Sequence, residues 1–332
     1  MKLKVGIIGA GYIGGVHAGI LARDKRVQLT AVYDVDRERA ERLARAHEAH
    51  VAASATEVIE RCDAVYVTAP NTQHVALTLA ALDAGKHVFC EKPLAINIGD
   101  AESVLSKSNR SKSVVQVGHN RRFAPVYATL KKLLSEHAPH SAHVKMNRGE
   151  LLNPVWTGDP SITGGFLYET PIHMFDMMRF LFGEVESLHA IGSKHEYREI
   201  DDFSVLLKFT NGFHATLATA ADASWLFPFE RVEVFCHHAT FVTREMETLV
   251  CSTNLEGHFT AQSMQQLPRE EKWGYVQEDR AFVDAIVNGT PPLVTALDGF
   301  MSVILVNAVY ESVATNANIS LPDEHPLRTC PA

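Results

Sequence analysis

Over roughly its first 120 residues the chain alternates short apolar runs with segments of helical pattern. The runs are rich in β-branched residues and show little polar alternation, which is typical of strands buried on both faces of a sheet. Alternation of strands and helices predicts a parallel sheet joined by right-handed crossovers. The predicted strands span residues 3–9, 28–34, 50–54 (the weakest), 63–70, 86–91 and 113–119. The predicted helices span residues 11–23, 36–47, 54–61, 71–84 and 97–109.

After residue 121 the pattern changes to a series of strands with few helices between them. The runs 203–209 and 213–219 flank a Thr-Asn-Gly turn, and an Asn-Gly step between alternating runs is a strong hairpin signal. This half predicts a mostly antiparallel open sheet with helices on one face. Residues 254–274 are expected to be the least structured. Further strands are predicted at 230–236, 240–244 and 248–253, and helices at 274–288 and 298–316.

Composition excludes several classes of partner. The net charge is -8 and the sequence contains no basic block, which argues against nucleic acid and anionic membranes. We find no apolar run approaching the roughly 18 residues of a membrane span. The five cysteines are scattered and form no C-x-x-C pair, which argues against a disulfide framework or structural zinc. We therefore expect a cytoplasmic protein.

A glycine motif follows the first predicted strand. Gly9, Gly11 and Gly14 form G-x-G-x-x-G at the start of a predicted helix, and Asp34 ends the next strand. In a dinucleotide-binding fold the first glycine permits a tight turn, the second admits the pyrophosphate, and the third allows close packing of helix on strand. The helix N-terminus then offers free N–H groups to the phosphates. The motif predicts a Rossmann domain over residues 1–121, followed by an α+β domain over residues 122–332.

Asp34 indicates which dinucleotide is bound. A carboxylate at this position accepts hydrogen bonds from the adenosine ribose hydroxyls and repels a 2′-phosphate, so NAD is predicted. Arg37 and Arg39 follow closely, and they leave NADP open as an alternative.

Polar residues follow two of the later strands. Pro70 and Asn71 lie beyond the strand 63–70, where open parallel sheets bind ligands. Asn71 is interpreted first as the cap of the next helix, with a nicotinamide-ribose contact as the alternative. Lys92 lies at the end of the strand 86–91, and Pro93 biases it toward an extended backbone. From its position alone, a functional lysine and a solvated surface lysine are equal alternatives.

A second set of polar residues lies in the segment 164–183. Pro171 is predicted as the first residue of a helix capped by Thr170 and ended by Gly183. His173 and Asp176 share one face of that helix, and Ile172, Phe175, Met178 and Phe182 form a separate apolar stripe. His173 lies in the first turn, where the helix dipole favours a neutral imidazole suited to a general base. Alone, these residues are interpreted first as a buried histidine and a helix-surface acid, with catalytic roles as the alternative.

Together these segments resemble the Gfo/Idh/MocA family of nicotinamide-dependent oxidoreductases, which includes inositol 2-dehydrogenase and glucose-fructose oxidoreductase. The resemblance rests on "GIIGAGYIGGVHAGIL", "AVYDVD", "TAPNTQHV", "AGKHVFCEKPLA", "VGHNRRFAP" and "GGFLYETPIHMFDMMRFLFG". It implies that Lys92 contacts the reacting oxygen and the cofactor, and that His173 exchanges the proton of the substrate hydroxyl. Glu169 and Asp176 would orient this relay. The resemblance further implies that the cofactor contacts Tyr12, Ile13, Ala69, His74 and Glu91.

The resemblance also indicates the substrate pocket. Arg121 and Arg122 correspond to linker arginines that line it in the inositol dehydrogenase branch, with a solvated basic pair as the alternative. Asn153 and Trp156 are interpreted as its edge because a tryptophan face suits a sugar ring. One departure is Glu169, where inositol dehydrogenases carry aspartate, so myo-inositol itself is less favoured than dehydrogenation. The predicted activity is NAD-dependent oxidation of a ring hydroxyl of a polyol or sugar.

Two other functions are kept open. An oxidoreductase of a sugar nucleotide or sugar phosphate would use Arg121, Arg122, Lys145 and Arg148 as anionic anchors. A non-catalytic regulatory protein on the same fold would require a damaged catalytic set, whereas Lys92 and His173 are both present. In this family a face of the antiparallel sheet is a subunit interface, so a homodimer or homotetramer is expected. No metal is expected, because no third ligand accompanies His237 and His238.

Overall fold

The computed structural model describes residues 2–149, 155–224, 230–255 and 257–321. They form two compact units, which are described separately. Among the described residues, the first unit contains 2–119 together with 275–303, and the second contains those of 120–274 together with 304–321. The predicted division at residue 121 places 275–303 with the second half, whereas this return segment groups with the first unit.

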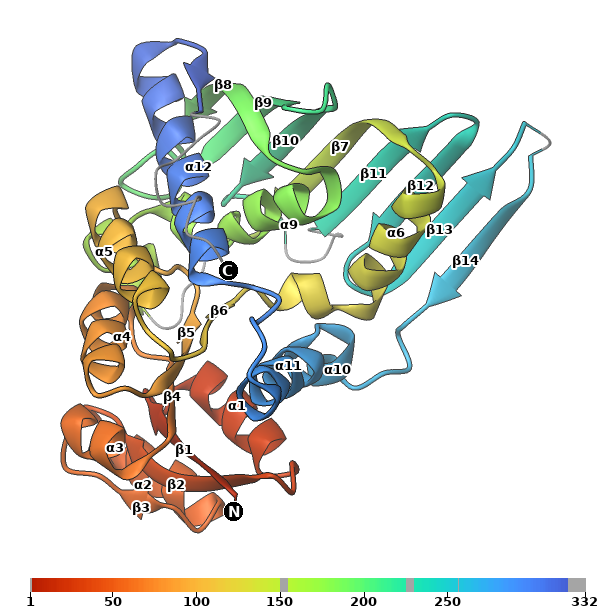
Figure 1. The fold of residues 1–332 in the computed structure, drawn as a ribbon. Helices are drawn as coiled ribbons and strands as arrows, with labels where there is room; N and C mark the ends of the chain where they lie inside the picture. The colour runs from red at the N-terminus through yellow and green to blue at the C-terminus, as the bar shows by residue number, and fades with distance from the viewer. Residues whose placement is uncertain (1, 150–154, 225–229, 256, 322–332) are drawn as a thin grey trace. The chain divides into compact units, whose positions relative to one another are not determined.

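The first unit contains a six-stranded parallel sheet in the order β3-β2-β1-β4-β5-β6 (Figure 1). Strand order reverses between β1 and β4, and ligands of such sheets bind beyond the carboxyl ends of the strands at this point. The strands are β1 (Leu3–Ile8), β2 (Val27–Tyr33), β3 (His50–Val51), β4 (Ala64–Val67), β5 (His87–Glu91) and β6 (Val115–Gly118). The helices are α1 (Tyr12–Leu21), α2 (Arg37–Ala46), α3 (Ala55–Arg61), η1 (Asn71–Gln73), α4 (His74–Asp83) and α5 (Ile98–Asn109).

The return segment adds helix α11 (Tyr275–Asn288), which contacts α1. Its Phe282 packs edge-on against Tyr66 of β4 and Phe89 of β5, with ring centroids 5.5 and 5.7 Å away. Tyr66 and Phe89 are themselves stacked at 4.5 Å. All three side chains are fully buried, so the core of the parallel sheet is completed by residues about 200 positions further along the chain.

The second unit is built on a nine-stranded sheet in the order β14-β13-β12-β11-β7-β10-β9-β8-β15. Only β7 and β10 pair in parallel. The strands are β7 (Pro139–Asn147), β8 (Val185–Ser193), β9 (Asp202–Phe209), β10 (His214–Ala220), β11 (Glu230–Cys236), β12 (Ala239–Arg244), β13 (Thr248–Thr253), β14 (Phe259–Ser263) and β15 (Ile319–Ser320). The helices are η2 (Asn120–Phe123), α6 (Pro125–Glu136), η3 (Val155–Gly158), α7 (Pro160–Thr163), α8 (Phe166–Glu169), α9 (Ile172–Phe182) and α10 (Arg269–Lys272).

The predicted hairpin is confirmed. β9 and β10 pair antiparallel around a turn in which Gly212 has a φ of 85° and the Asn211 side chain accepts from the Phe213 N–H. Burial alternates along β9, as the sequence pattern predicts for a sheet with one covered face. The stretch expected to be least structured instead contains β14 and α10. Every residue of β14 is exposed, so the strand carries no alternation that the sequence could reveal.

Helix α12 (Ala296–Thr315) runs from the first unit into the second. The expectation that no segment approaches a membrane span is wrong by length and composition, because this helix has 20 residues and a mean hydropathy of 1.3. However, 61% of its most apolar window is buried inside the protein. This burial is that of a core helix, which is apolar because it packs on several sides.

We predict that two neighbouring glycines of α1 respond oppositely to alanine. A Cβ at Gly14 would lie 2.1 Å from the carbonyl oxygen of Gly9, whereas a Cβ at Gly15 would meet nothing within 4 Å. Gly14→Ala should cost about 1–3 kcal/mol through overpacking, while Gly15→Ala should gain about 0.5–1 kcal/mol of helix stability. Melting temperatures without cofactor measure both. Equal melting temperatures for the two variants would show that the helix does not pack as closely as described.

Candidate active site

The glycine loop of the first unit has the shape that a dinucleotide requires. Gly9 has a φ of 105°, and its backbone approaches that of Thr68 so closely that a Cβ would lie 2.5 Å from it. The Thr68 hydroxyl donates to the Gly9 carbonyl at 2.7 Å. Gly11 is the N-cap of α1, and the space beside it is open. The loop therefore leaves room for a phosphate at the N-terminus of a ten-residue helix.

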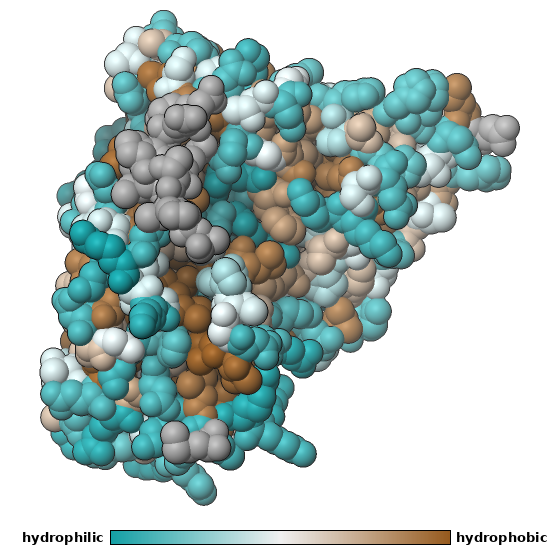
Figure 2. Space-filling view, in the orientation of Figure 1, coloured by the Kyte–Doolittle hydropathy of each residue, from teal (hydrophilic) through white to brown (hydrophobic). Residues whose placement is uncertain are grey.

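Residues of α1 and the strand ends surround this loop. Tyr12 is 63% exposed and Ile13 is half-buried at the start of the helix. Figure 2 shows hydrophobic residues on the visible face of this unit, in the region where Figure 1 draws α1 and the neighbouring strands. Such a surface suits the apolar faces of a dinucleotide.

Asp34 follows β2 and holds the glycine loop. Its carboxylate accepts the Ala10 N–H at 2.7 Å and the Asp36 N–H at 2.8 Å. A carboxylate has about four acceptor positions, so these two bonds leave capacity for ribose hydroxyls. The nearby Arg37 and Arg39 pair on the surface with Glu41 and Asp36.

His74 connects the ends of β4 and β5. Its Nδ1 lies 2.7 Å from the Pro93 carbonyl oxygen, and its Nε2 lies 2.8 Å from that of Ala69. Burial lowers the pKa of His74, in opposition to the two carbonyl acceptors, which favour a charged ring. Sequence reasoning interpreted Asn71 as a helix cap, but Asn71 opens η1, and the cap position of α4 is Gln73. The histidine therefore holds together the segments that carry Asn71 and Lys92.

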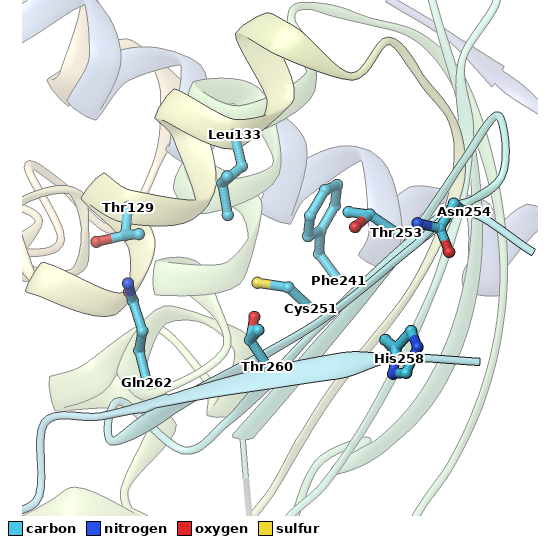
Figure 3. Close-up of a pocket in the computed structure, with 9 residues that line it drawn as sticks. All are labelled: Thr129, Leu133, Phe241, Cys251, Thr253, Asn254, His258, Thr260 and Gln262. Atoms are coloured by element: carbon cyan, nitrogen blue, oxygen red, sulfur yellow. The ribbon is translucent and has the colours of Figure 1, made fainter. Parts of the chain in front are cut away.

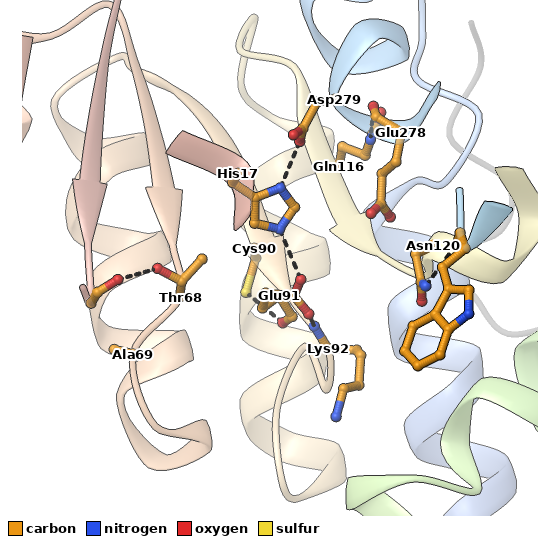
Figure 4. A network of polar contacts seen from close by, with 12 residues as sticks. His17, Thr68, Ala69, Cys90, Glu91, Lys92, Gln116, Asn120, Glu278 and Asp279 are labelled. Atoms are coloured by element: carbon orange, nitrogen blue, oxygen red, sulfur yellow. Dashed lines mark hydrogen bonds and ion pairs between the residues drawn. The ribbon is translucent and has the colours of Figure 1, made fainter. Parts of the chain in front are cut away.

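Lys92 is half-buried directly after β5, and its peptide bond to Pro93 is cis. Its backbone N–H donates to Glu91 Oε2 at 3.1 Å. The other oxygen of Glu91 lies 3.1 Å from His17 Nε2, and His17 Nδ1 lies 2.7 Å from Asp279 Oδ1. We call these three side chains and the Lys92 N–H the His17 network (Figure 4). The Lys92 side chain extends away from the Glu91 carboxylate.

The His17 network is a buried arrangement of charges. His17 and Asp279 are at most 1% exposed, and Glu91 is 8% exposed. Burial by itself lowers the pKa of His17, but the adjacent Asp279 and Glu91 carboxylates outweigh it and raise that pKa well above its usual value. The pKa of Asp279 is raised too, in this case by burial. The His17 imidazole and the Asp279 carboxylate therefore compete for one proton. We place this proton on the imidazole because the ring faces a second carboxylate, Glu91.

In the second unit the predicted catalytic residues lie on two consecutive helices. Glu169 ends α8 and His173 is the second residue of α9, and both are 9% exposed. The predicted cap at Thr170 is not formed, because α9 begins at Ile172 with Pro171 in the cap position and no side-chain cap bond. Nearly every residue of α9 is buried, so the helix does not have the single apolar stripe that its sequence suggested.

Asp176 and the two arginines form buried ion pairs. The Arg122 guanidinium donates to both oxygens of Asp176, at 2.8 and 2.6 Å. Arg121 donates through two nitrogens to Glu230 Oε2, at 2.8 and 2.7 Å. The other oxygen of Glu230 accepts from the Tyr127 hydroxyl at 2.5 Å. Both acids are fully buried and both arginines nearly so. The arginines are therefore not a solvated pair, and they anchor η2 to α9 and to β11.

The remaining predicted substrate residues are placed less completely. Asn153 lies outside the described residues. Trp156 belongs to η3, and only its backbone is described. Lys145 is half-buried on β7. Arg148 is 2% exposed, lies over the Phe166 ring at 5.2 Å, and donates to Tyr197 at 3.3 Å.

A hollow of about 260 Å³ in the second unit is unrelated to the predicted site. It lies between α6 and the outer strands β12 to β14, with Cys251 near its centre (Figure 3). None of its lining residues belongs to the predicted site. Within the described ranges, no group of three His, Cys, Asp or Glu side chains has the arrangement of a metal site.

Sequence reasoning missed His17, Asp279, Glu230 and Tyr127. For His17 a signal exists, since it is the one ionisable residue in the segment "IGGVHAGIL", where a buried charge requires a partner. No local signal identifies Asp279, which is 262 positions away from His17.

Comparison with known proteins defines the class. The model of the GFO/IDH/MocA oxidoreductase family, NAD-binding Rossmann fold, matches residues 3–119, and the model of its C-terminal alpha/beta domain matches residues 131–321. The myo-inositol 2-dehydrogenase of Thermotoga maritima is 28% identical over 332 residues, which cover 97% of this chain and 99% of that protein. The inositol 2-dehydrogenase of Rhizobium meliloti is 27% identical over 342 residues, with coverage of 97% and 100%.

A solved structure shows the same fold. Levoglucosan dehydrogenase in complex with NADH and levoglucosan superposes with a TM-score of 0.89 at 22% identity, covering 97% of this chain and 100% of that one. The protein is an NAD-dependent oxidoreductase with a Rossmann domain and a C-terminal domain built on a mostly antiparallel sheet. It belongs to the GFO/IDH/MocA oxidoreductase family. The predicted family, fold class, enzyme class and cofactor are thereby confirmed, and the roles of individual site residues remain predictions.

We predict that His17 stabilises the fold in a pH-dependent manner. Its folded-state pKa is raised, so its contribution is complete below the unfolded pKa of about 6.5 and is lost as pH rises through the folded value. His17→Gln leaves two buried carboxylates without a cation, which should lower the melting temperature by roughly 5 °C or more at pH 6 and by less at pH 9.

His87→Gln is the matched control for this measurement. Burial lowers the pKa of His87, so protonation of His87 opposes folding as pH falls. The difference between wild type and His87→Gln should therefore change with pH in the opposite sense. A His17→Gln penalty that grows from pH 6 to pH 9 would contradict the charge assignment.

Proposed function

We propose that the protein is a dehydrogenase that oxidises a ring hydroxyl of a polyol or sugar with NAD. The proposal is supported by family membership, by relatives named inositol 2-dehydrogenase over nearly their whole length, and by the presence of both Lys92 and His173 at positions matching the family motifs. The open space beside Gly11 and the free acceptor capacity of Asp34 fit a bound dinucleotide.

Lys92 and His173 have complementary roles in this proposal. A ring nitrogen of His173 takes the proton of the substrate hydroxyl as the C–H bond breaks. The Lys92 ammonium stabilises the negative charge that develops on the same oxygen as it becomes a carbonyl. Bound NAD supplies the hydride acceptor. Glu169, buried just before α9, orients the imidazole or binds a second substrate hydroxyl.

Asp176 is assigned a positioning role rather than direct contact with the substrate. Both of its oxygens are held by Arg122, which fixes α9 against η2. This holds His173, one turn earlier on the same helix, in a constant position.

The charge pairing favours a neutral substrate over a phosphorylated one. A phosphate reaching Arg121 or Arg122 would compete with a buried carboxylate that already makes two hydrogen bonds. Displacing such a partner leaves an uncompensated buried charge, which costs about 3–5 kcal/mol. A sugar phosphate or sugar nucleotide is therefore the second choice, and a non-catalytic regulator is the third because both reacting groups are present.

We also propose that the second unit mediates assembly into a homodimer or homotetramer. Leu206 on β9 and Ile191 on β8 are 54% and 67% exposed, and both lie on the uncovered side of alternating strands. Large exposed apolar side chains on an open sheet are suited to burial against a second copy. The predicted cytoplasmic location is kept as a proposal.

Cofactor choice is predicted to depend on Asp34. Asp34→Ala removes the ribose acceptor and the repulsion of a 2′-phosphate, so the ratio of the Kd for NAD to that for NADP should rise at least tenfold. The ratio is the informative quantity, because the lost bond to the Ala10 N–H disturbs the loop for both cofactors alike. Fluorescence titration with NADH and NADPH measures it, and an unchanged ratio would remove Asp34 from the recognition of the ribose.

Turnover is predicted to depend on Lys92. Inositols, levoglucosan and common aldoses are incubated with NAD, and NADH formation is followed by absorbance. For the best substrate, Lys92→Ala should lower kcat about 10²–10⁴-fold, with the Kd for NADH within about threefold. Lys86→Ala, in the turn before the same strand, is the matched control and should keep full activity. Near-normal turnover by Lys92→Ala would reject the proposed role.

A further inference from the structure

We propose that His17 and Asp279 are positioning residues for Lys92, acting through Glu91. The inference rests on the proposed function of Lys92, and it adds two residues to which the sequence analysis assigned no role. The observation that carries it is an unbroken series of contacts from Asp279 to His17, from His17 to Glu91, and from Glu91 to the backbone N–H of Lys92.

The directions of these hydrogen bonds follow from the partners. Both neighbours of the His17 ring are carboxylate oxygens, which only accept when ionised. Both ring nitrogens therefore donate, and the ring is an imidazolium that joins two anions. One anion is fixed on α11 and the other is Glu91 at the end of β5, so the charge of His17 sets the position of the Glu91 carboxylate.

Glu91 has little freedom to move away. A Cβ at Gly118 of β6 would lie 2.9 Å from both Cδ and Oε2 of Glu91, so the carboxylate lies directly against the backbone of the next strand. It is held on its other side by His17. The oxygen nearest Gly118 is the one that accepts the Lys92 N–H, and this bond fixes the backbone from which the lysine side chain extends.

This arrangement explains why the network contains charges. A lysine side chain has several rotatable bonds, and an error of about 1 Å in a reacting group can cost on the order of 100-fold in rate. Charge-assisted hydrogen bonds are shorter and stronger than neutral ones. The series of such bonds ties the lysine backbone to two helices, α1 and α11. His74 supports the following residue in the same way, through the Pro93 carbonyl.

The first test measures backbone protection and requires no activity. Hydrogen–deuterium exchange is followed at the Lys92 amide, in peptides spanning 88–96, for wild type, His17→Gln and His87→Gln. His87 is on the same strand and binds the Val114 N–H, so it controls for the loss of a histidine. We expect exchange at Lys92 to be at least tenfold faster in His17→Gln and unchanged in His87→Gln. Equal protection in wild type and His17→Gln would overturn the proposal.

The second test is a double-mutant cycle in turnover, with the panel polyol that wild type oxidises fastest. We expect His17→Gln to lower kcat roughly 10–100-fold, with the Kd for NADH within threefold. Because His17 acts through Lys92, this effect should vanish when Lys92 is already alanine. Full additivity would show that His17 has a general structural role and would overturn the inference.

Two further outcomes are decisive. If His17→Gln does not fold, Asp279→Asn replaces it, because this change removes one charge at nearly constant volume. Asp279→Asn should then show faster exchange at the Lys92 amide and a lowered kcat that depends on Lys92. If wild type oxidises no polyol of the panel, the proposed function fails, and the exchange measurement by itself decides whether the network holds Lys92.

Discussion

The buried charge of His17 connects the parts of the first unit that form its site. This side chain lies on the helix that follows the glycine loop, and its two carboxylate partners come from the end of β5 and from α11. A charge in such a place is tolerated only when it is paired and hydrogen-bonded. The helix after the glycine loop, the strand that precedes Lys92 and the return segment must therefore assemble together, and none of them can shift without leaving a buried ion unpaired.

The second unit follows the same physical rule with different residues. Arg121 and Arg122, adjacent in sequence, point to two separate buried acids, Glu230 on β11 and Asp176 on α9. Such pairs contribute little net stability compared with apolar packing, but removing one partner is costly. Their effect is to fix geometry: η2 is held against a strand and a helix at once, and the helix carries His173. The backbone segments that carry Lys92 and His173, the proposed reacting groups, are thus each held by an ion network.

Several features were predictable because they depend on local patterns. Runs of β-branched residues marked the parallel strands, and Gly9 and Gly14 marked positions where a Cβ would collide with neighbouring backbone atoms. The hairpin at Asn211 followed from turn chemistry. Strands β7, β8, β14 and β15 and helix α6 were missed. β14 has no covered face, so its sequence shows no alternation of apolar and polar residues. In β8 the exposed and buried residues alternate only in part.

The sequence by itself determined the fold class and the cofactor loop, because each depends on local patterns, and it also predicts Lys92 and His173 as the reacting groups. Only the tertiary structure decided the partners of the charges. The two linker arginines, interpreted as substrate contacts, are paired with buried acids, and Glu91 faces His17 rather than solvent. Pairing over 54 to 262 positions is set by which elements pack together, and a linear pattern carries no record of that packing.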